Sequence, residues 1–455
     1  MKNQFVDMKR ILRYMVLLLM LATAVESMAQ INKWRDVYTA KKKDTLFGIA
    51  RKYDITVPDL MEANPEMKQT GYELKKGDTV FIPFAKKSIQ PVATPKQTKA
   101  VPVTERQIRV GVMLPIHNVD GDGRRMVEYY RGVLMACDSL RSIGISTEVH
   151  TWNVPIDANI HQTLLDNAAK ECDIIFGPLY THQVKPLGDF CKANDIKLVI
   201  PFSISSDEVT RNPQIFQVYQ EEDNLNNDAI NAFLARFPKH HPVFIDCNDK
   251  TSKKGVFTMG LRAQLEKKGI KYNVTNTASS EEMFAKAFSR TQPNIVILNT
   301  GRSPELNVAL AKINGLTTNY PGIVVTLFGY NEWLMYTEQN LNNFFKFDTY
   351  IPSTYYYNAL SPRTQGFEKN FRRWFKTDLQ YAYPRFALTG YDQAMFFLRG
   401  LHKYGKNFTG SRSENVYMPM QTPLYFKRIG QGGYQNANFQ LIHYTYNHSI
   451  ESVNY

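Results

Sequence analysis

Hydrophobic residues from position 108 to the C-terminus follow two alternating patterns. Short runs of β-branched and aliphatic residues predict strands, and the stretches between them, in which apolar residues recur every three or four positions, predict helices. This alternation is typical of parallel sheets covered by helices, and the region is longer than one such sheet usually needs, so we expect two α/β lobes. The predicted strands are 108–114, 173–177, 196–200, 242–246, 294–299 and 322–327, and the predicted helices are 124–142, 159–170, 183–194, 254–268 and 303–314.

A much shorter unit precedes this region. Apolar residues spaced three and four apart from Leu46 to Tyr53 predict one amphipathic helix, and Asp44 is placed to accept its first free N–H groups. Thr56, with Asp59 three residues later, is predicted to cap a second short helix. The predicted flanking strands are 37–40 and 79–83.

The N-terminus has the pattern of a secretory signal peptide. A basic segment precedes the apolar residues 14–25, and Ser27, Met28 and Ala29 form a small-x-small cleavage site. The apolar run is shorter than the roughly 20 residues of a spanning helix, so a retained membrane anchor is the weaker interpretation. No cysteine follows the run, so a lipoprotein is not expected. We expect 1–29 to be removed, which leaves a periplasmic protein with no membrane span.

Charge and composition separate the short unit from the long region. The chain has a formal net charge of +13, and residues 30–107 hold more basic than acidic side chains. Such a balance favours an anionic partner, such as a wall polymer or a membrane surface. Residues 85–107 contain three prolines and no glycine, which predicts a semi-extended linker that leaves the two parts thermodynamically separate. The export signal argues against nucleic acid as a partner.

The four cysteines, Cys137, Cys172, Cys191 and Cys247, have no C-x-x-C spacing and lie among apolar residues. A zinc or redox site is therefore not expected. In an exported protein they are consistent either with buried free thiols or with a structural disulfide, and the spacing does not decide between these alternatives.

The short unit closely resembles the LysM domain. The residues that carry the resemblance are Tyr38-Thr39, Asp44-Thr45-Leu46, Ile49-Ala50, Tyr53, Leu60, Asn64-Pro65, Leu74, Gly77, Ile82 and Pro83. The resemblance implies a βααβ fold over residues 36–84 that binds the N-acetylglucosamine-containing glycan of peptidoglycan, in a groove between the loop before the first helix and the loop after the second. The implied glycan-binding residues are Asp44, Thr45, Leu46, Asn64, Pro65 and Glu66.

The same residues also have a purely structural interpretation. Asp44 and Thr45 suit a helix cap, and Asn64 followed by Pro65 suits a helix end. One departure from the LysM pattern is Lys43, at a position where the family usually has glycine.

Residues 108–455 resemble the type I periplasmic-binding fold of leucine/isoleucine/valine-binding receptors. The residues that carry this resemblance are 110–115 (VGVMLP), 130–133 (YRGV) leading into Ala136, 175–178 (IFGP), 197–210 (KLVIPFSISSDEVT) and 215–224 (IFQVYQEEDN). The resemblance implies a first lobe of about 108–222 and 356–415, and a second lobe of about 226–352 and 420–455.

In that fold a small ligand lies between the lobes, where strand ends and helix N-termini meet. The implied cleft residues are Leu179, Tyr180, Thr181, Ser203, Ile204, Ser205 and Asn331. The serines are also typical turn and cap residues, and this alternative stays open.

The second lobe departs from the amino-acid receptors at two positions. Lys254-Gly255 stands where they place an aromatic residue before glycine, and Asn331 stands where they place the acid that pairs with the ligand's ammonium, with Glu332 one residue later. A buried ammonium without that acid is costly. Ordinary amino-acid capture is therefore not expected.

No catalytic signature is present in the sequence. H-E-x-x-H, G-x-S-x-G and P-loop motifs are absent, so we expect no catalytic residue, no metal and no cofactor. Three functions are compatible with the two resemblances. The chain is a cell-wall-tethered binding protein for a small ligand or a wall-synthesis protein, a solute receptor of an amino-acid-type ABC transporter, or a wall-cutting enzyme. The first is preferred because a tether opposes diffusion to a permease, and the third is the weakest.

Overall fold

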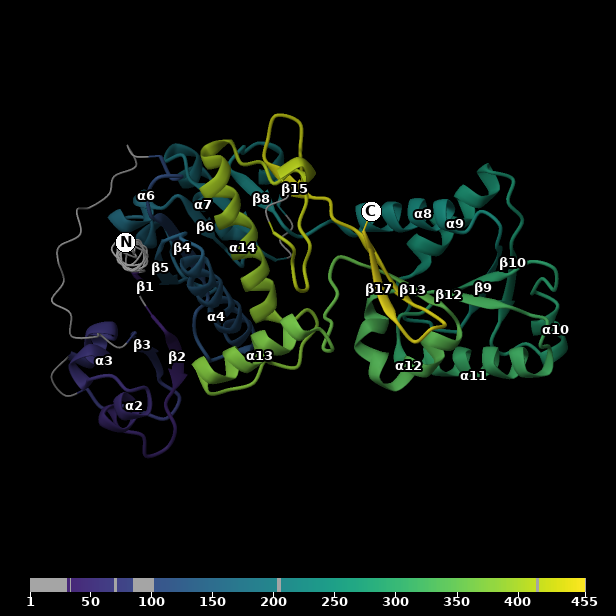
Figure 1. Ribbon diagram of the computed structural model, residues 1–455, viewed down its shortest axis with the longest axis horizontal. Helices are drawn as coiled ribbons and strands as arrows, with labels where there is room; N and C mark the ends of the chain where they lie inside the picture. The colour runs from purple at the N-terminus through teal and green to yellow at the C-terminus, as the bar shows by residue number, and fades with distance from the viewer. Residues whose placement is uncertain are drawn as a thin grey trace, which may run out of the picture. The chain divides into compact units, whose positions relative to one another are not determined.

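The computed structural model describes residues 31–32, 34–68, 72–84, 102–202, 206–414 and 417–454 (Figure 1). The expected signal peptide lies outside these ranges, as do residues 85–101 of the expected linker. The chain divides into two compact units, one formed by Met1–Pro178, His182–Leu198 and Ala394–Phe408, the other by Leu179–Thr181, Val199–Gln393 and Thr409–Tyr455. Within the described ranges, no helix is both long enough and apolar enough to cross a membrane.

The N-terminal module, residues 34–84, has the predicted order of two strands around two helices. Its strands pair antiparallel, and its small core includes Ile49, Leu60, Val80 and Ile82 (Figure 1). The elements are β2 (Asp36–Thr39), α2 (Leu46–Lys52), α3 (Val57–Ala63), the 3-10 helix η1 (Pro65–Lys68) and β3 (Thr79–Ile82).

The start of α2 differs from the sequence prediction. Thr45, not Asp44, is the N-cap, because its hydroxyl accepts a hydrogen bond from the Gly48 N–H at 3.0 Å. Thr56 caps α3 as predicted. In the loop before α2, Lys43 has a φ of 76°, a left-handed conformation that glycine adopts without strain. The loop therefore keeps the backbone of a glycine-containing turn although its residue is lysine.

The first large sheet has eight strands, in the order β1-β5-β4-β6-β7-β8-β15-β14. Neighbouring strands from β1 to β6 are parallel, and β14 and β15 form an antiparallel pair at the far edge. Every residue of β4 is buried, which is consistent with its mostly apolar sequence. The strands are β1 (Ile31–Asn32), β4 (Ile108–Leu114), β5 (Thr147–Asn153), β6 (Ile174–Phe176), β7 (Lys197–Ile200), β8 (Ile215–Gln217), β14 (Phe426–Arg428) and β15 (Tyr434–Asn436).

The helix that follows β4 is longer than predicted. It begins at Gly121 instead of residue 124, because the side chain of Asp120 accepts a hydrogen bond from the Gly123 N–H at 2.7 Å and caps it. The predicted helix at 159–170 is broken into two, since Asp166 caps a new helix. The helices along the chain from β4 to β8 are α4 (Gly121–Ser142), α5 (Ile160–Thr163), α6 (Asn167–Glu171), α7 (Thr181–Ala193) and the 3-10 helix η2 (Asp207–Thr210).

The second large sheet has seven strands, in the order β10-β9-β11-β12-β13-β16-β17. The first five are parallel, and the C-terminal hairpin β16-β17 pairs antiparallel with β13. In Figure 1, α8 and α9 lie along one face of this sheet and α11 and α12 along the other. The strands are β9 (His241–Asp246), β10 (Asn273–Asn276), β11 (Asn294–Leu298), β12 (Val325–Phe328), β13 (Thr349–Ser353), β16 (Gln440–Tyr444) and β17 (Ile450–Asn454).

Most of the remaining helices belong to the second unit, and the chain segment Ala394–Phe408 belongs to the first. The remaining helices are α8 (Glu222–Arg236), α9 (Gly255–Lys267), α10 (Glu281–Ala285), α11 (Ser303–Asn319), η3 (Asn331–Tyr336), α12 (Thr337–Lys346), α13 (Pro362–Phe375), α14 (Phe386–Tyr404), η4 (Gly405–Asn407) and η5 (Arg412–Glu414). The fold class is confirmed: a small βααβ module is followed by an α/β region with two mostly parallel sheets and flanking helices.

The resemblance implies that residues 420–455 belong to the second lobe, and these bounds stay a prediction. The second compact unit includes Thr409–Tyr455, in which β14 and β15 pair in the first sheet and β16 and β17 in the second. All four cysteines, each of which lies in the described ranges, are buried thiols, which agrees with the thiol alternative and not with the disulfide.

Candidate functional site

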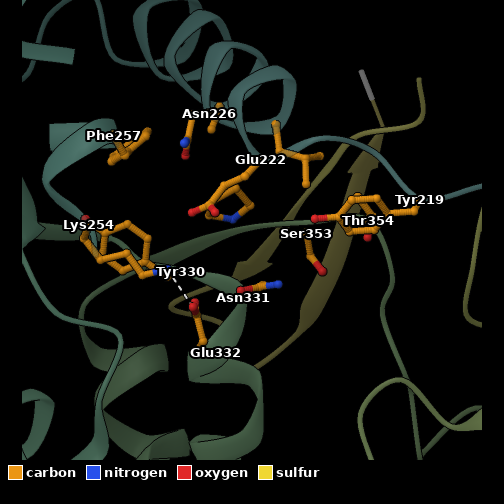
Figure 2. Close-up of a pocket in the computed structure, with 13 residues that line it drawn as sticks. Tyr219, Glu222, Asn226, Lys254, Phe257, Tyr330, Asn331, Glu332, Ser353 and Thr354 are labelled. Carbon is orange, nitrogen blue, oxygen red and sulfur yellow. Dashed lines mark hydrogen bonds and ion pairs between the residues drawn. The ribbon is translucent and has the colours of Figure 1, made fainter. Parts of the chain in front are cut away.

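A pocket of about 280 Å³ opens at the carboxyl ends of β12 and β13 in the second unit (Figure 2). Ligand sites of open α/β sheets occur at this edge, because strand ends and helix N-termini meet there. The lining combines aromatic rings with carboxylates, amides and one ammonium. It consists of Tyr219, Glu222, Leu225, Asn226, Ala229, Lys254, Phe257, Tyr330, Asn331, Glu332, Pro352, Ser353 and Thr354.

Helix starts and strand ends carry the polar groups of the pocket. Glu222 is the first residue of α8, and Lys254 is the N-cap of α9. Asn331 and Glu332 begin η3 directly after β12, and Ser353 ends β13. The loops after parallel strands thus bring these groups to one edge, although they are far apart in the sequence.

An ion pair crosses one side of the pocket. The Lys254 ammonium lies 2.6 Å from Glu332 Oε1 and 4.8 Å from the centre of the Tyr330 ring. The Lys254 side chain is 18% exposed and that of Glu332 is 37% exposed. The second carboxylate oxygen of Glu332, Oε2, is buried and has no hydrogen-bond partner. One acceptor beside the pocket is therefore unsatisfied.

Hydrogen bonds to backbone carbonyls fix the two aromatic side chains next to this ion pair. The Tyr330 hydroxyl donates a hydrogen bond to the Leu298 carbonyl at 2.6 Å, and the Trp333 indole donates to the Thr300 carbonyl at 3.2 Å. At Gly301 a Cβ atom would lie only 3.1 Å from Cε of Lys254. Glycine at this position lets the lysine reach Glu332 without displacement.

Two carboxylates approach the pocket from opposite sides. Figure 2 shows Glu222 reaching in from α8, with Glu332 on the η3 side beside Lys254. Because Lys254 balances only one of the two acids, the pocket keeps an excess of negative charge. Carboxylates, amides and aromatic faces together suit a small polar ligand with hydroxyl or amine groups. Within the described ranges, no group of three or more His, Cys, Asp or Glu side chains is arranged to hold a metal ion.

Only part of the predicted cleft can be placed at this pocket. Asn331 lines it, whereas its lining does not include Leu179, Tyr180 or Thr181, which precede and begin α7. Ser203, Ile204 and Ser205 lie outside the described residues. Lys254, at one of the two positions that depart from the amino-acid receptors, forms an ion pair with Glu332, the residue after the other departing position, Asn331.

Sequence reasoning missed Glu222 and Tyr330 as pocket residues. Glu222 lies in the stretch IFQVYQEEDN, five residues after β8, so its place after a strand was visible in the sequence. Tyr330 carries no such signal, because aromatic residues after strands are more often part of the core.

The N-terminal module presents a second candidate site at the loop before α2 and the loop after α3. Thr45, Pro65 and Glu66 are exposed, and Asp44 and Leu46 are half-buried. Phe47, which the sequence analysis did not include, is 68% exposed at the start of α2. An exposed aromatic ring beside polar loop residues is suited to stacking on a sugar ring.

Asp44 holds the first of these loops in shape. Its Oδ2 accepts hydrogen bonds from the Lys41 N–H at 2.8 Å and from the Tyr38 hydroxyl at 2.7 Å. These two bonds lower the pKa of Asp44. Burial, together with the bond to Asp44, raises the pKa of Tyr38 to about 12.

Asn64 has a structural role, and its implied glycan contact stays a prediction. It is 0% exposed, and its amide donates to the carbonyls of Leu60 and Phe81 and accepts from the Phe81 N–H, each at 2.7 Å. The side chain thus joins α3 to β3, and no polar atom is left for a sugar. Its position after the helix made it a candidate, but only the tertiary packing shows that it points inward.

Comparison with known families and structures agrees with both parts of the chain. Residues 38–83 match the LysM domain family. A structure described as a branched-chain amino acid ABC transporter from Rhodospirillum rubrum has a TM-score of 0.53 at 11% identity, and the match covers 76% of this chain and 100% of the other. This likeness shows the type I periplasmic-binding fold.

Two further structures were also found. A substrate-binding protein of a branched-chain amino acid ABC transporter from Burkholderia xenovorans matches with a TM-score of 0.46 and 12% identity, over 76% of this chain and 94% of its own. An ABC transporter substrate-binding protein from Desulfitobacterium hafniense, in complex with Leu, matches with a TM-score of 0.40 and 14% identity, over 76% of this chain and 100% of its own. A comparison with curated proteins found no match. LysM domains and binding-protein folds are both non-catalytic kinds of domain.

Proposed function

We propose that this chain is a non-catalytic periplasmic binding protein tethered to the cell wall. Its LysM domain binds the N-acetylglucosamine-containing glycan of peptidoglycan, and its larger domain binds a small polar ligand or a wall-synthesis protein. The observation that carries the proposal is the LysM match at residues 38–83, joined to a region with the periplasmic-binding fold and a polar pocket. The signal-peptide pattern of residues 1–29 supports export.

The exposed loops of the LysM domain support glycan binding. Thr45, Phe47, Pro65 and Glu66 are all open to solvent at neighbouring loops of the module. The positive balance of residues 30–107 adds attraction to an anionic wall.

The pocket chemistry supports a ligand other than leucine, isoleucine or valine. Lys254 already balances Glu332, so the acid that stands nearest to Asn331 has its own counter-ion. An aliphatic amino acid would have to compete with that lysine for the carboxylate. The larger domain then binds through Glu222, Asn226 and the free oxygen of Glu332, with Ser203 and Ser205 as further candidates.

An ABC-transporter solute receptor is the second candidate function. The likeness of the larger domain to the Rhodospirillum rubrum structure favours it, but at 11% identity this likeness supports the fold and not the ligand. A receptor that must diffuse to its permease is also poorly served by a wall-binding domain.

The wall-binding half is tested by pelleting the mature protein with purified peptidoglycan. The double variant Phe47→Ala/Glu66→Ala should pellet at least fivefold less, because both side chains are exposed and their loss removes contacts without disturbing the core. Glu73→Ala, the same change at an exposed site elsewhere on the module, is the control. Equal pelleting of the wild type and the double variant would refute this assignment of the groove.

The ligand-binding half is tested by thermal shift. Leucine, isoleucine and valine at millimolar concentration should leave the melting temperature unchanged, while one or more of a set of dipeptides, muropeptides and amino sugars should raise it, since binding stabilises only the native state. A clear shift with any of the three aliphatic amino acids would favour the transport receptor instead.

A further inference from the structure

Two consecutive residues of α4 bind the LysM domain in the first compact unit. The Tyr130 hydroxyl donates a hydrogen bond to the Trp34 carbonyl at 2.9 Å, and Tyr130 is fully buried. Arg131 donates from Nε to Asp36 Oδ1 at 2.6 Å and from a terminal nitrogen to the Val37 carbonyl at 3.3 Å. These bonds join residues separated by more than ninety positions in the sequence.

Asp36 shows that this contact excludes water. Its side chain is 1% exposed, and that of Arg131 is 15% exposed. Within the LysM domain, the Val37 N–H donates to Oδ1 of this carboxylate at 2.8 Å, and the buried Tyr53 hydroxyl donates to Oδ2 at 3.3 Å. A carboxylate buried to this degree needs a positive partner, and α4 supplies it.

Two further interactions join the N-terminal segment to the region that contains α4. The strand β1, just before the LysM domain, pairs in parallel with the edge of β5. Asn118, in the loop before α4, donates a long hydrogen bond of 3.4 Å to the Val37 carbonyl. The glycan-binding loops take no part in these bonds, and Thr45, Phe47, Pro65 and Glu66 stay exposed.

We propose that the LysM domain is docked on α4 as a fixed part of the first unit, held by the Asp36–Arg131 pair and the Tyr130–Trp34 hydrogen bond, with its glycan groove left open. A glycan in the groove is then held by a body that includes β4, β5 and α4. The two parts open and unfold together, in contrast to the independent behaviour that the linker composition predicts.

Hydrogen exchange of the full mature chain, followed by mass spectrometry, tests the docking without any ligand. The main variant is Asp36→Asn/Arg131→Met, which removes the charge link without leaving a lone buried charge. The control is Asp122→Asn/Arg125→Met, which removes an exposed pair with a distance of 2.8 Å on the same helix. Peptides covering β2, α3 and β3 should exchange at least tenfold faster in the main variant and at the wild-type rate in the control.

Unchanged exchange in the main variant would overturn the proposal. Retained pelleting with peptidoglycan, together with faster exchange, supports it, because the module is then folded but undocked. If pelleting is lost as well, the module itself has unfolded and a second variant is needed. Tyr130→Phe changes only α4 and removes the hydrogen bond to the Trp34 carbonyl. Faster module exchange in Tyr130→Phe supports docking, and the wild-type rate there rejects it.

A soluble N-acetylglucosamine oligomer provides the second arm, which rests on the proposed glycan binding. In the wild type it should slow exchange both in the module and in peptides covering α4, and in the main variant only in the module. If the oligomer changes no peptide in either protein, glycan binding by the module fails while the ligand-free arm still tests the docking. If the oligomer slows hydrogen exchange only in the module of the wild-type protein, the proposal that the module and α4 form one rigid unit is contradicted.

Discussion

Two ion pairs, one in each compact unit, differ in how their carboxylates are satisfied. Asp36 is 1% exposed, and both of its oxygens have partners, from Arg131, the Val37 N–H and the Tyr53 hydroxyl. Glu332 is 37% exposed, pairs with Lys254 through one oxygen, and keeps the other without a partner. A fully satisfied buried pair specifies how two segments pack, whereas a half-satisfied pair at a pocket is available to a ligand.

The comparison predicts the largest loss of stability for Arg131→Ala. Removing the partner of a buried carboxylate typically costs about 3–5 kcal/mol, and urea unfolding of the full chain should detect a loss of this size. Arg125→Ala removes an exposed pair on the same helix and should cost at most about 1 kcal/mol. Similar small losses in both variants would show that the Asp36–Arg131 pair is not structurally important.

The stability lost in the Arg131→Ala variant should depend on pH. Burial raises the pKa of Asp36, and the charge of Arg131 opposes this shift. Without Arg131 the folded-state pKa lies further above the unfolded value, so protonation stabilises the folded variant. The deficit relative to the wild type should be largest at neutral pH and should shrink as the pH falls through the folded-state pKa.

A second prediction extends the comparison to a polar side chain without charge. Asn64→Ala removes three hydrogen bonds and leaves the Phe81 N–H and two carbonyls without that partner. Each unsatisfied buried group costs about 1–3 kcal/mol, so the LysM domain should lose roughly 2 kcal/mol or more in urea unfolding. The exposed Glu66→Ala should change stability by less than about 0.5 kcal/mol while weakening peptidoglycan binding. Normal stability of Asn64→Ala with lost binding would restore Asn64 as a glycan contact.

A third prediction concerns the pocket pair. Glu332→Gln and Lys254→Met should each change the stability of the unliganded protein by at most about 1 kcal/mol, because a partly exposed pair contributes little. Any small molecule that raises the melting temperature of the wild type should raise it much less in Glu332→Gln. An undiminished shift in that variant would move the binding site away from this pocket.

The smallest expected effect is a gain. Lys43 has a φ of 76°, so Lys43→Gly relieves backbone strain and should stabilise the LysM domain by about 0.5–1 kcal/mol. Lys42→Gly, one residue earlier and without a positive φ, should destabilise it by about 0.5 kcal/mol through the added freedom of the unfolded chain. A stabilisation by both glycines, or by neither, would argue against strain at Lys43.

Local pattern was enough to predict several of the buried strands. The six strands predicted after residue 107 correspond to β4, β6, β7, β9, β11 and β12, with ends shifted by at most a few residues. Most residues of these strands are buried, and apolar residues predominate in their sequences. The strand β5 was missed because its residues alternate between buried and half-buried, and α8 and α13 were missed because polar residues dominate them.

The candidate sites were predictable to the extent that they depend on neighbouring residues. The LysM pattern identified Thr45, Pro65 and Glu66, which are exposed on the module, because the loops and caps of so small a domain are set by residues a few positions apart. The same reasoning could not tell that Asn64 points inward, since its partner Phe81 is seventeen residues away.

The sequence by itself determined the two kinds of domain, the order of many of their elements and the two unusual positions Lys254 and Asn331. Only the tertiary structure decided that Lys254 pairs with Glu332, 78 residues away, and that Asp36 meets Arg131 across 95 residues. Hydrophobic periodicity and caps record interactions within one or two turns of chain. Pairings between distant segments depend on how strands order in a sheet and which helix covers which face, and no local pattern encodes them.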